Sequence, residues 1–277
     1  MLRPDERSAI RWVALELLDS DSVRRVLSEP FDYVVHLAAV ASGVEARQHP
    51  GNAWAVNADG TARVLEVAAH RRLAGASDPT ILLASSGEVY GAAATKPLRE
   101  TDPVRPCSPY AASKAGAELA ALETSERTGL KVIVARPFQQ TGPGQDERFV
   151  VAALARRLRG ARLAGARVVK VGNLEPVRDF IDVRDACVAL RALLERGASG
   201  GVYNIATGRG IRLVDLFARI AATVGVDAIA EVDPELMRPA DIPYLVGDAS
   251  KLERETGWTQ RIPLEQTIAD VVAAQTD

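Results

Sequence analysis

A Tyr and a Lys four positions apart, Tyr110 and Lys114, stand near the middle of the chain. Pro109 suits the first turn of a helix and Ser108 suits the N-cap, so the Ala-rich sequence after them predicts a helix. On that helix the two side chains share a face. A free Tyr has a pKa of about 10, and a nearby ammonium favours the phenolate, so the pair could transfer a proton. The alternative is a surface helix with an ordinary Tyr and an ordinary Lys.

Strands predicted on either side of this helix end in residues that could bind a ligand. Apolar runs at 80–84 and 131–135 predict two buried strands, which Ser85 and Ser86 follow in one case and Arg136 in the other. Strand and helix alternate through the first half, which predicts an α/β fold with helices on both faces of a parallel sheet. Ligands bind beyond the carboxyl ends of such strands, where we expect these side chains to meet Tyr110.

The remaining pattern predicts two units built from interleaved segments. We expect further strands at 12–17, 31–37, 168–174, 177–181 and 201–205, and helices at 19–28, 57–72, 147–159, 182–194, 213–224, 250–256 and 264–274. The first unit, a doubly wound parallel sheet, takes 1–137 and 177–207. A smaller α+β lobe for the substrate takes 138–176 and 208–277.

Composition argues for a small-molecule partner in the cytoplasm. A net charge of -2 provides no electrostatic footprint for nucleic acid or an anionic membrane. No apolar run reaches membrane length, and the charged start, MLRPDER, is not that of a signal peptide. Two cysteines suit a reducing compartment. The three histidines have no metal-ligand spacing, so we expect no metal.

A doubly wound nucleotide-binding sheet usually begins with a strand, a Gly-rich turn and a helix, which bind the pyrophosphate. The sequence contains neither GxGxxG nor GxxGxxG, and only 11 residues precede Trp12. If the strand order is the usual 3-2-1-4-5-6, the strand at 12–17 is the third. The expectation is that the true start lies upstream. The alternative is a fragment whose remaining sheet closes differently.

Seven short segments and one single residue, Asn57, carry a family resemblance. Leu37-Ala38-Ala39, Asn57, SSGEVYG at 85–91, SPYAASK at 108–114 and RPF at 136–138 resemble the extended short-chain dehydrogenases/reductases that act on nucleotide sugars. TGPGQ at 141–145, VGNLEPVRDFIDVRD at 171–185 and RPADIP at 238–243 are similar to the GDP-4-keto-6-deoxy-D-mannose reductases and their dehydratase relatives. The similarity extends over nearly the whole chain from Trp12.

The resemblance implies a catalytic triad of Ser86, Tyr110 and Lys114. The two hydroxyls would face the 4-keto oxygen of a GDP-linked deoxy sugar, and Tyr110 would supply the proton while hydride from NADP or NAD reaches C4. Lys114 would bind the nicotinamide ribose and hold the pKa of Tyr110 down. The residues that would bind the cofactor are Leu37, Ala38, Ala39, Asn57, Ala84, Ser85, Tyr110, Lys114, Pro137 and Phe138.

The resemblance also implies a substrate site. Arg178 and Arg238 would bind the diphosphate, a task that suits the planar guanidinium fork. An ion pair with a neighbouring Asp is the alternative for Arg178. The full set implied for the substrate is Ser86, Gln139, Phe149, Val150, Val171, Asn173, Leu174, Arg178 and Arg238. At Gln139 the family often has Asn, one methylene shorter.

Glu88 leaves the reaction open. It matches the position where the dehydratases keep a base, so GDP-mannose 4,6-dehydration or another nucleotide-sugar dehydration or epimerisation is the alternative to reduction. Those dehydratases usually place Thr where this chain has Ser86, which favours reduction. A third hypothesis is an inactive relative that acts as a binding protein. The Ala-rich faces predicted at 57–72 and 110–126 indicate a homodimer.

Overall fold

A four-stranded parallel sheet forms the centre of the first half of the molecule. The computed structural model describes residues 9–92, 95–237 and 242–275. The sheet has the order β1-β2-β3-β7, and each neighbouring pair is parallel. Its strands are β1 (Tyr33–His36), β2 (Thr80–Ala84), β3 (Val132–Pro137) and β7 (Val202–Ile205). The predicted α/β class is confirmed, as is the return of a late strand, β7, to this sheet.

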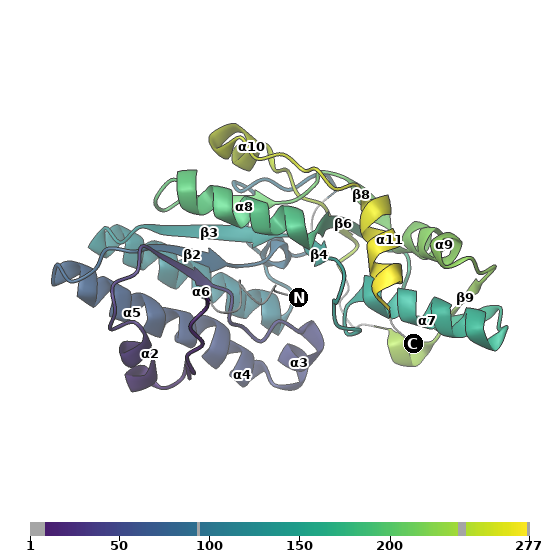
Figure 1. The fold of residues 1–277 in the computed structure, drawn as a ribbon, viewed down its shortest axis with the longest axis horizontal. Helices are drawn as coiled ribbons and strands as arrows, with labels where there is room; N and C mark the ends of the chain where they lie inside the picture. The colour runs from purple at the N-terminus through teal and green to yellow at the C-terminus, as the bar shows by residue number, and fades with distance from the viewer. Residues whose placement is uncertain (1–8, 93–94, 238–241, 276–277) are drawn as a thin grey trace.

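Helices cover both faces of the sheet, as Figure 1 shows. α5 (Gly60–Leu73) and α6 (Pro109–Thr128) lie on one face, and α8 (Val183–Arg196) lies on the other. β2 and β3 are almost completely buried, as their unbroken apolar runs predicted. α6 begins at Pro109, and the Ser108 hydroxyl accepts from the Ala111 amide, so the predicted N-cap is confirmed.

β1 is the outer strand of this sheet in the described part of the chain, and the strand predicted at 12–17 is wrong. Residues 12–16 are irregular, and Trp12 is 77% exposed. A strand needs a neighbour for its backbone groups, and no described strand pairs with this segment. Leu17 instead packs against α2 (Ser20–Val26) and α5. Tyr33 and Val35 of β1 are exposed along the sheet's edge.

The second half adds a lobe beside the carboxyl edge of the sheet (Figure 1). β4 (Gln139–Thr141) pairs with β6 (Val177–Asp182), which also pairs with β8 (Gly210–Arg212) and β10 (Tyr244–Leu245). A separate pair joins β5 (Val168–Val171) to β9 (Ile229–Val232). A second core lies among the helices α7 (Val150–Ala164), α9 (Leu213–Val224) and α11 (Leu264–Ala274). β6 therefore lies in the sheet that β4, β8 and β10 share, while α8 and β7 pack with the first sheet. The boundaries predicted for the two units stay a prediction.

Short elements complete the described fold. They are α3 (Gly43–Gln48), α4 (Pro50–Trp54), a π-helix (Ala55–Asp59), 3₁₀-helices at Gly87–Tyr90 and Pro234–Leu236, and α10 (Ser250–Thr256). Among the residues that the structure describes, no helix is both long and apolar enough to cross a membrane.

Candidate active site

The hydroxyls of Ser86 and Tyr110 meet at the carboxyl edge of the parallel sheet. Ser86 follows β2, and its Oγ accepts from the Glu88 amide at 3.1 Å, which caps the 3₁₀-helix 87–90. Tyr110 lies in the first turn of α6, and its phenol is close enough to the Ser86 hydroxyl for that group to act on its pKa. Glu88, half-buried, lies close enough for its charge to act on the phenol. Three predicted catalytic residues therefore share one site.

The lowered pKa expected for Tyr110 is wrong for this structure. Burial raises the pKa of Tyr110 above its usual value, the Glu88 charge raises it further, and the nearby Ser86 hydroxyl opposes both. A phenolate is poorly solvated in such a site, so the neutral form is favoured. The phenol of Tyr110 therefore keeps its proton at neutral pH.

Lys114 is held one turn further along α6. Only 5% of it is exposed, and its Nζ donates to the Ala84 carbonyl at the end of β2, at 2.7 Å. Burial lowers the pKa of Lys114 to about 8, and the charge of Glu118 opposes that effect. His36 at the end of β1 is buried too. Burial and then the Lys114 charge lower the pKa of His36 to about 4, so its ring is neutral beside the ammonium.

Asn57 sits in the π-helix, a backbone irregularity frequent at functional sites. Its side chain accepts from the Val40 amide at 2.8 Å and donates to Ser113 Oγ at 2.9 Å. Ser113 in turn donates to the Tyr110 carbonyl. Asn57 therefore joins the loop after β1, which carries Leu37, Ala38 and Ala39, to the catalytic helix; a direct contact with cofactor stays a prediction.

The other residues predicted to bind cofactor end the central strands. Leu37 and Ala38 are exposed after β1, Ala84 and Ser85 end β2, and Pro137 and Phe138 end β3. These positions form one edge, which fits the nicotinamide end of the cofactor. Phe138 is 3% exposed and packs in the core, so its backbone is what this edge presents. The sequence has no Gly-rich motif that would fit the pyrophosphate.

Gln139 carries a buried side-chain oxygen with no hydrogen-bond partner. Such an atom costs free energy unless a ligand or water satisfies it. Gln139 lies on β4 opposite Phe180 of β6, two residues beyond Arg178. The adjacent Asp179 is fully buried and accepts from Thr207, Gly208 and Gly247, which fixes the loops on either side of β6.

The remaining substrate residues are distributed over the second lobe. Phe149, which is 37% exposed, precedes α7, and Val150 begins that helix. Val171 and Leu174 are buried in the lobe's core, and the Asn173 side chain accepts from the Glu175 amide. Arg238 lies outside the described residues.

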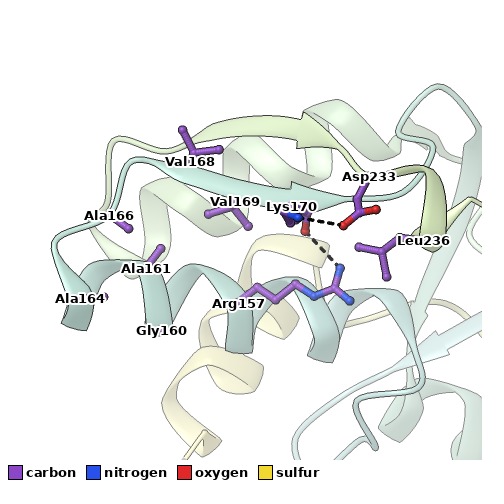
Figure 2. Close-up of a pocket in the computed structure, with 10 residues that line it drawn as sticks. All are labelled: Arg157, Gly160, Ala161, Ala164, Ala166, Val168, Val169, Lys170, Asp233 and Leu236. Atoms are coloured by element: carbon purple, nitrogen blue, oxygen red, sulfur yellow. Dashed lines mark hydrogen bonds and ion pairs between the residues drawn. The ribbon is translucent and has the colours of Figure 1, made fainter.

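A cavity of about 430 Å³ opens in the second lobe between α7, β5 and the 3₁₀-helix 234–236 (Figure 2). Arg157 reaches from α7 to the Lys170 carbonyl, and Lys170 pairs with Asp233 at 3.4 Å. Small residues line the helix side, among them Gly160 and Ala161. The cavity does not include the Ser86–Tyr110 site, which lies at the edge of the first sheet.

A buried charged cluster behind the site was not predicted. Glu118 and Arg136 are an ion pair at 2.7 Å, 4% and 5% exposed at their side chains. The sequence does contain an indication of this pair, because Glu118 follows Lys114 by four residues and Arg136 ends a buried strand. Among the described residues, no group of three or more His, Cys, Asp or Glu side chains could hold a metal.

A Ser, Tyr and Lys at the carboxyl edge of a doubly wound parallel sheet, beside a second lobe, define an extended short-chain dehydrogenase/reductase. The chain belongs to the GDP-mannose 4,6-dehydratase family, whose model matches residues 2–271.

Three relatives illustrate the range of this family. The chain is 34% identical to GDP-6-deoxy-D-mannose reductase of Pseudomonas aeruginosa over 93% of its own length and 84% of the relative's. The structure of RMD from Pseudomonas aeruginosa complexed with NADPH matches with a TM-score of 0.86 and 32% identity, covering 95% of this chain and 87% of that one. GDP-mannose 4,6-dehydratase of Vibrio cholerae is 29% identical over 94% of this chain and 77% of the relative.

Proposed function

We propose that the protein reduces the 4-keto group of a GDP-4-keto-6-deoxyhexose with NADPH or NADH, giving a GDP-6-deoxyhexose such as GDP-6-deoxy-D-mannose (GDP-rhamnose). The juxtaposition of the Ser86 and Tyr110 hydroxyls carries the proposal, because two hydroxyl donors converge where one oxygen would gain charge. The 34% identity to a GDP-6-deoxy-D-mannose reductase supports the choice of substrate.

The chain's own residues have distinct roles in this reaction. Tyr110, neutral at physiological pH, donates its proton to the keto oxygen as that oxygen becomes an alkoxide. Ser86 donates a second hydrogen bond to the same oxygen. Lys114, anchored on the Ala84 carbonyl, presents its remaining donors to the cofactor's ribose. The bound nicotinamide supplies the hydride.

The nucleotide would extend into the second lobe. Arg178 and Gln139 would meet the diphosphate, with the unsatisfied Gln139 oxygen completed by substrate or water. We place the base toward the 430 Å³ cavity, since it lies between α7 and β5, the elements that carry Val150 and Val171. Arg157→Gln should then raise KM for the nucleotide sugar and leave kcat unchanged.

GDP-mannose 4,6-dehydration is the second candidate. Glu88 favours it, because its charge acts on Tyr110 and it could abstract a proton from the sugar. Ser86 in place of Thr favours the reductase. An inactive binding protein is the third candidate, since the sequence has no Gly-rich phosphate motif, and failure to bind either dinucleotide would support it.

We also propose a cytoplasmic homodimer. Leu73 of α5 and Leu119 of α6 are 64% and 71% exposed on neighbouring helices, which would bury them against a second copy. Cys107 and Cys187 are both exposed and are not joined in a disulfide, which suits a reducing compartment. Sedimentation at micromolar concentration should give a dimer, and Leu119→Glu should give a monomer.

The decisive experiment supplies the purified chain with two substrates in parallel. With GDP-4-keto-6-deoxymannose, NADPH should be oxidised, which is monitored as the loss of its near-ultraviolet absorbance. The product should be a GDP-6-deoxyhexose, identified by mass spectrometry. GDP-mannose with NAD or NADP tests the dehydratase. Dinucleotide binding without reduction of the keto sugar would refute the proposed reductase.

A further inference from the structure

Glu118 continues a series of functional side chains along one face of α6. Tyr110, Lys114 and Glu118 are spaced by four residues, so they stack along the helix. Glu118 is 3% exposed, although an isolated buried carboxylate is strongly disfavoured. Its surroundings must therefore compensate the charge.

Two elements supply that compensation. Arg136, at the end of β3, donates from Nε to Glu118 Oε1 at 2.9 Å and from Nη2 to Oε2 at 2.7 Å. The Ser85 hydroxyl, at the end of β2, donates to Oε1 as well. Arg136 also donates to the Tyr90 hydroxyl at 2.9 Å. The carboxylate thus joins the ends of both central strands to the catalytic helix.

This junction reaches Lys114 through one peptide unit. The Ala84 carbonyl, which accepts from Lys114 Nζ, is covalently bonded to the Ser85 nitrogen. That nitrogen donates to the Ala135 carbonyl at 2.7 Å, and the Ser85 hydroxyl is held by Glu118. The position of the anchor carbonyl therefore depends on the Glu118 carboxylate.

The charged and titratable groups facing Lys114 come from several elements. Tyr110 and Glu118 lie on its own helix, His36 on β1, Arg136 on β3 behind Glu118, and Glu88 beside Tyr110. His36 is neutral at physiological pH. Of these groups, Glu118 is the one whose charge opposes the effect of burial on the Lys114 amine.

We infer that Glu118 is a positioning residue for Lys114: through Ser85 it fixes the carbonyl that anchors the amine, and its carboxylate, one helical turn away, is a counter-charge to the ammonium. The role in turnover rests on the proposed reductase activity. The effect of Glu118 on the Lys114 amine is independent of that activity, so it can be measured without substrate or cofactor.

The first test follows the ionisation of Lys114 directly. The chain has five lysines, so ¹³Cε-lysine labelling gives few signals, and Lys114→Met assigns the one of interest. Glu118→Gln should lower the pKa of the Lys114 amine by about 1–3 units. Glu123→Gln is the matched control, because Glu123 lies on the same helix in an exposed pair with Arg127 and should leave the titration unchanged. An unchanged Lys114 titration in folded Glu118→Gln overturns the inference.

A second variant guards against misfolding, because Glu118→Gln leaves Arg136 without its counter-charge. Exchanging both residues for Met removes the buried pair at similar volume, a change that proteins often tolerate. The double variant should fold and still show a Lys114 pKa below that of the wild type. A Lys114 pKa in the double variant equal to that of the wild type would also overturn the inference.

The third test concerns the anchor. Ser85→Ala removes the link to Glu118 and changes no charge, so the Lys114 titration should stay within a few tenths of a unit. If the wild type reduces the keto sugar, kcat of Ser85→Ala should fall about tenfold at every pH, whereas the activity of Glu118→Gln should fall most on the alkaline side. Unchanged kcat in Ser85→Ala would refute the anchoring role. If the wild type does not reduce the keto sugar but Glu118→Gln still shifts the Lys114 titration as predicted, the proposed function is refuted and the inference about Glu118 is not.

Discussion

Replacing Ser86 by Ala separates its catalytic role from its structural one. The hydroxyl accepts from the Glu88 amide at 3.1 Å and lies close to the Tyr110 phenol, so the variant loses a helix cap and at most one further hydrogen bond. A cap contributes about 1 kcal/mol and a neutral hydrogen bond about the same. Folded domains are stable by roughly 5–15 kcal/mol, so the variant should stay folded and melt a few degrees lower.

The catalytic loss should be much larger than the loss of stability accounts for. Removing one of two donors aimed at a developing oxyanion costs about 10²–10³ in kcat. We therefore expect Ser86→Ala to reduce the keto sugar at least 100-fold more slowly, with KM little changed, in a stopped or continuous NADPH oxidation assay. Ser86→Thr keeps the hydroxyl and should keep kcat within about tenfold of the wild type.

Asp19→Ala provides a control for the capping role. Asp19 caps α2 through a bond to the Asp21 amide at 2.9 Å, away from the carboxyl edge of the sheet. It should lower the melting temperature by a similar amount and leave kcat unchanged. A Ser86→Ala enzyme within threefold of wild-type kcat would show that Ser86 contributes no catalytic hydrogen bond.

Three further predictions address neighbouring groups. Tyr110→Phe should lower kcat by about 10²–10⁴ with the fold retained by circular dichroism, while Tyr33→Phe on the exposed edge of β1 should be neutral. Asp179→Asn leaves buried amide donors unsatisfied and should reduce the free energy of unfolding by about 2–4 kcal/mol in urea titrations; a loss below 0.5 kcal/mol would contradict this. Because the folded pKa of His36 is about 4 against about 6.5 unfolded, its neutral form stabilises the protein above pH 6.5. That contribution, about 3 kcal/mol, should disappear as the pH falls to 4, and in His36→Gln this part of the pH dependence should be missing.

The elements that sequence predicted well are those whose local pattern and burial agree. The run at 80–84 is apolar after Thr80 and is buried in the sheet. The apolar stripe at 213–224 matches a helix packed on one side, and both elements were predicted with their observed bounds. Residues 12–17 have the same strand propensity, but a strand is also defined by its neighbour. That neighbour is absent from the described part of the chain, so propensity alone gave the wrong answer.

The site shows a similar limit. Spacing brought Tyr110 and Lys114 onto one face, and the resemblance identified Ser86, but the acidity of Tyr110 depends on burial and on Glu88, which no local pattern reveals. Glu118 and Arg136 lie 18 residues apart in sequence and meet only because α6 packs across the end of β3. Such pairs require the tertiary fold.

Glu88 offers the sharpest separation of the two candidate reactions. In a reductase it only adds negative charge near Tyr110, so Glu88→Gln should lower the pKa of that phenol and keep kcat for the keto sugar within about tenfold at pH 7. In a dehydratase it is the base, and its loss should lower conversion of GDP-mannose by about 10²–10⁴. Glu126→Gln, exposed on α6, controls for the loss of one carboxylate. A fall of 100-fold or more in reduction by Glu88→Gln would mean that Tyr110 does not act alone as the proton donor, because a carboxylate outside the proton path cannot supply a factor of that size.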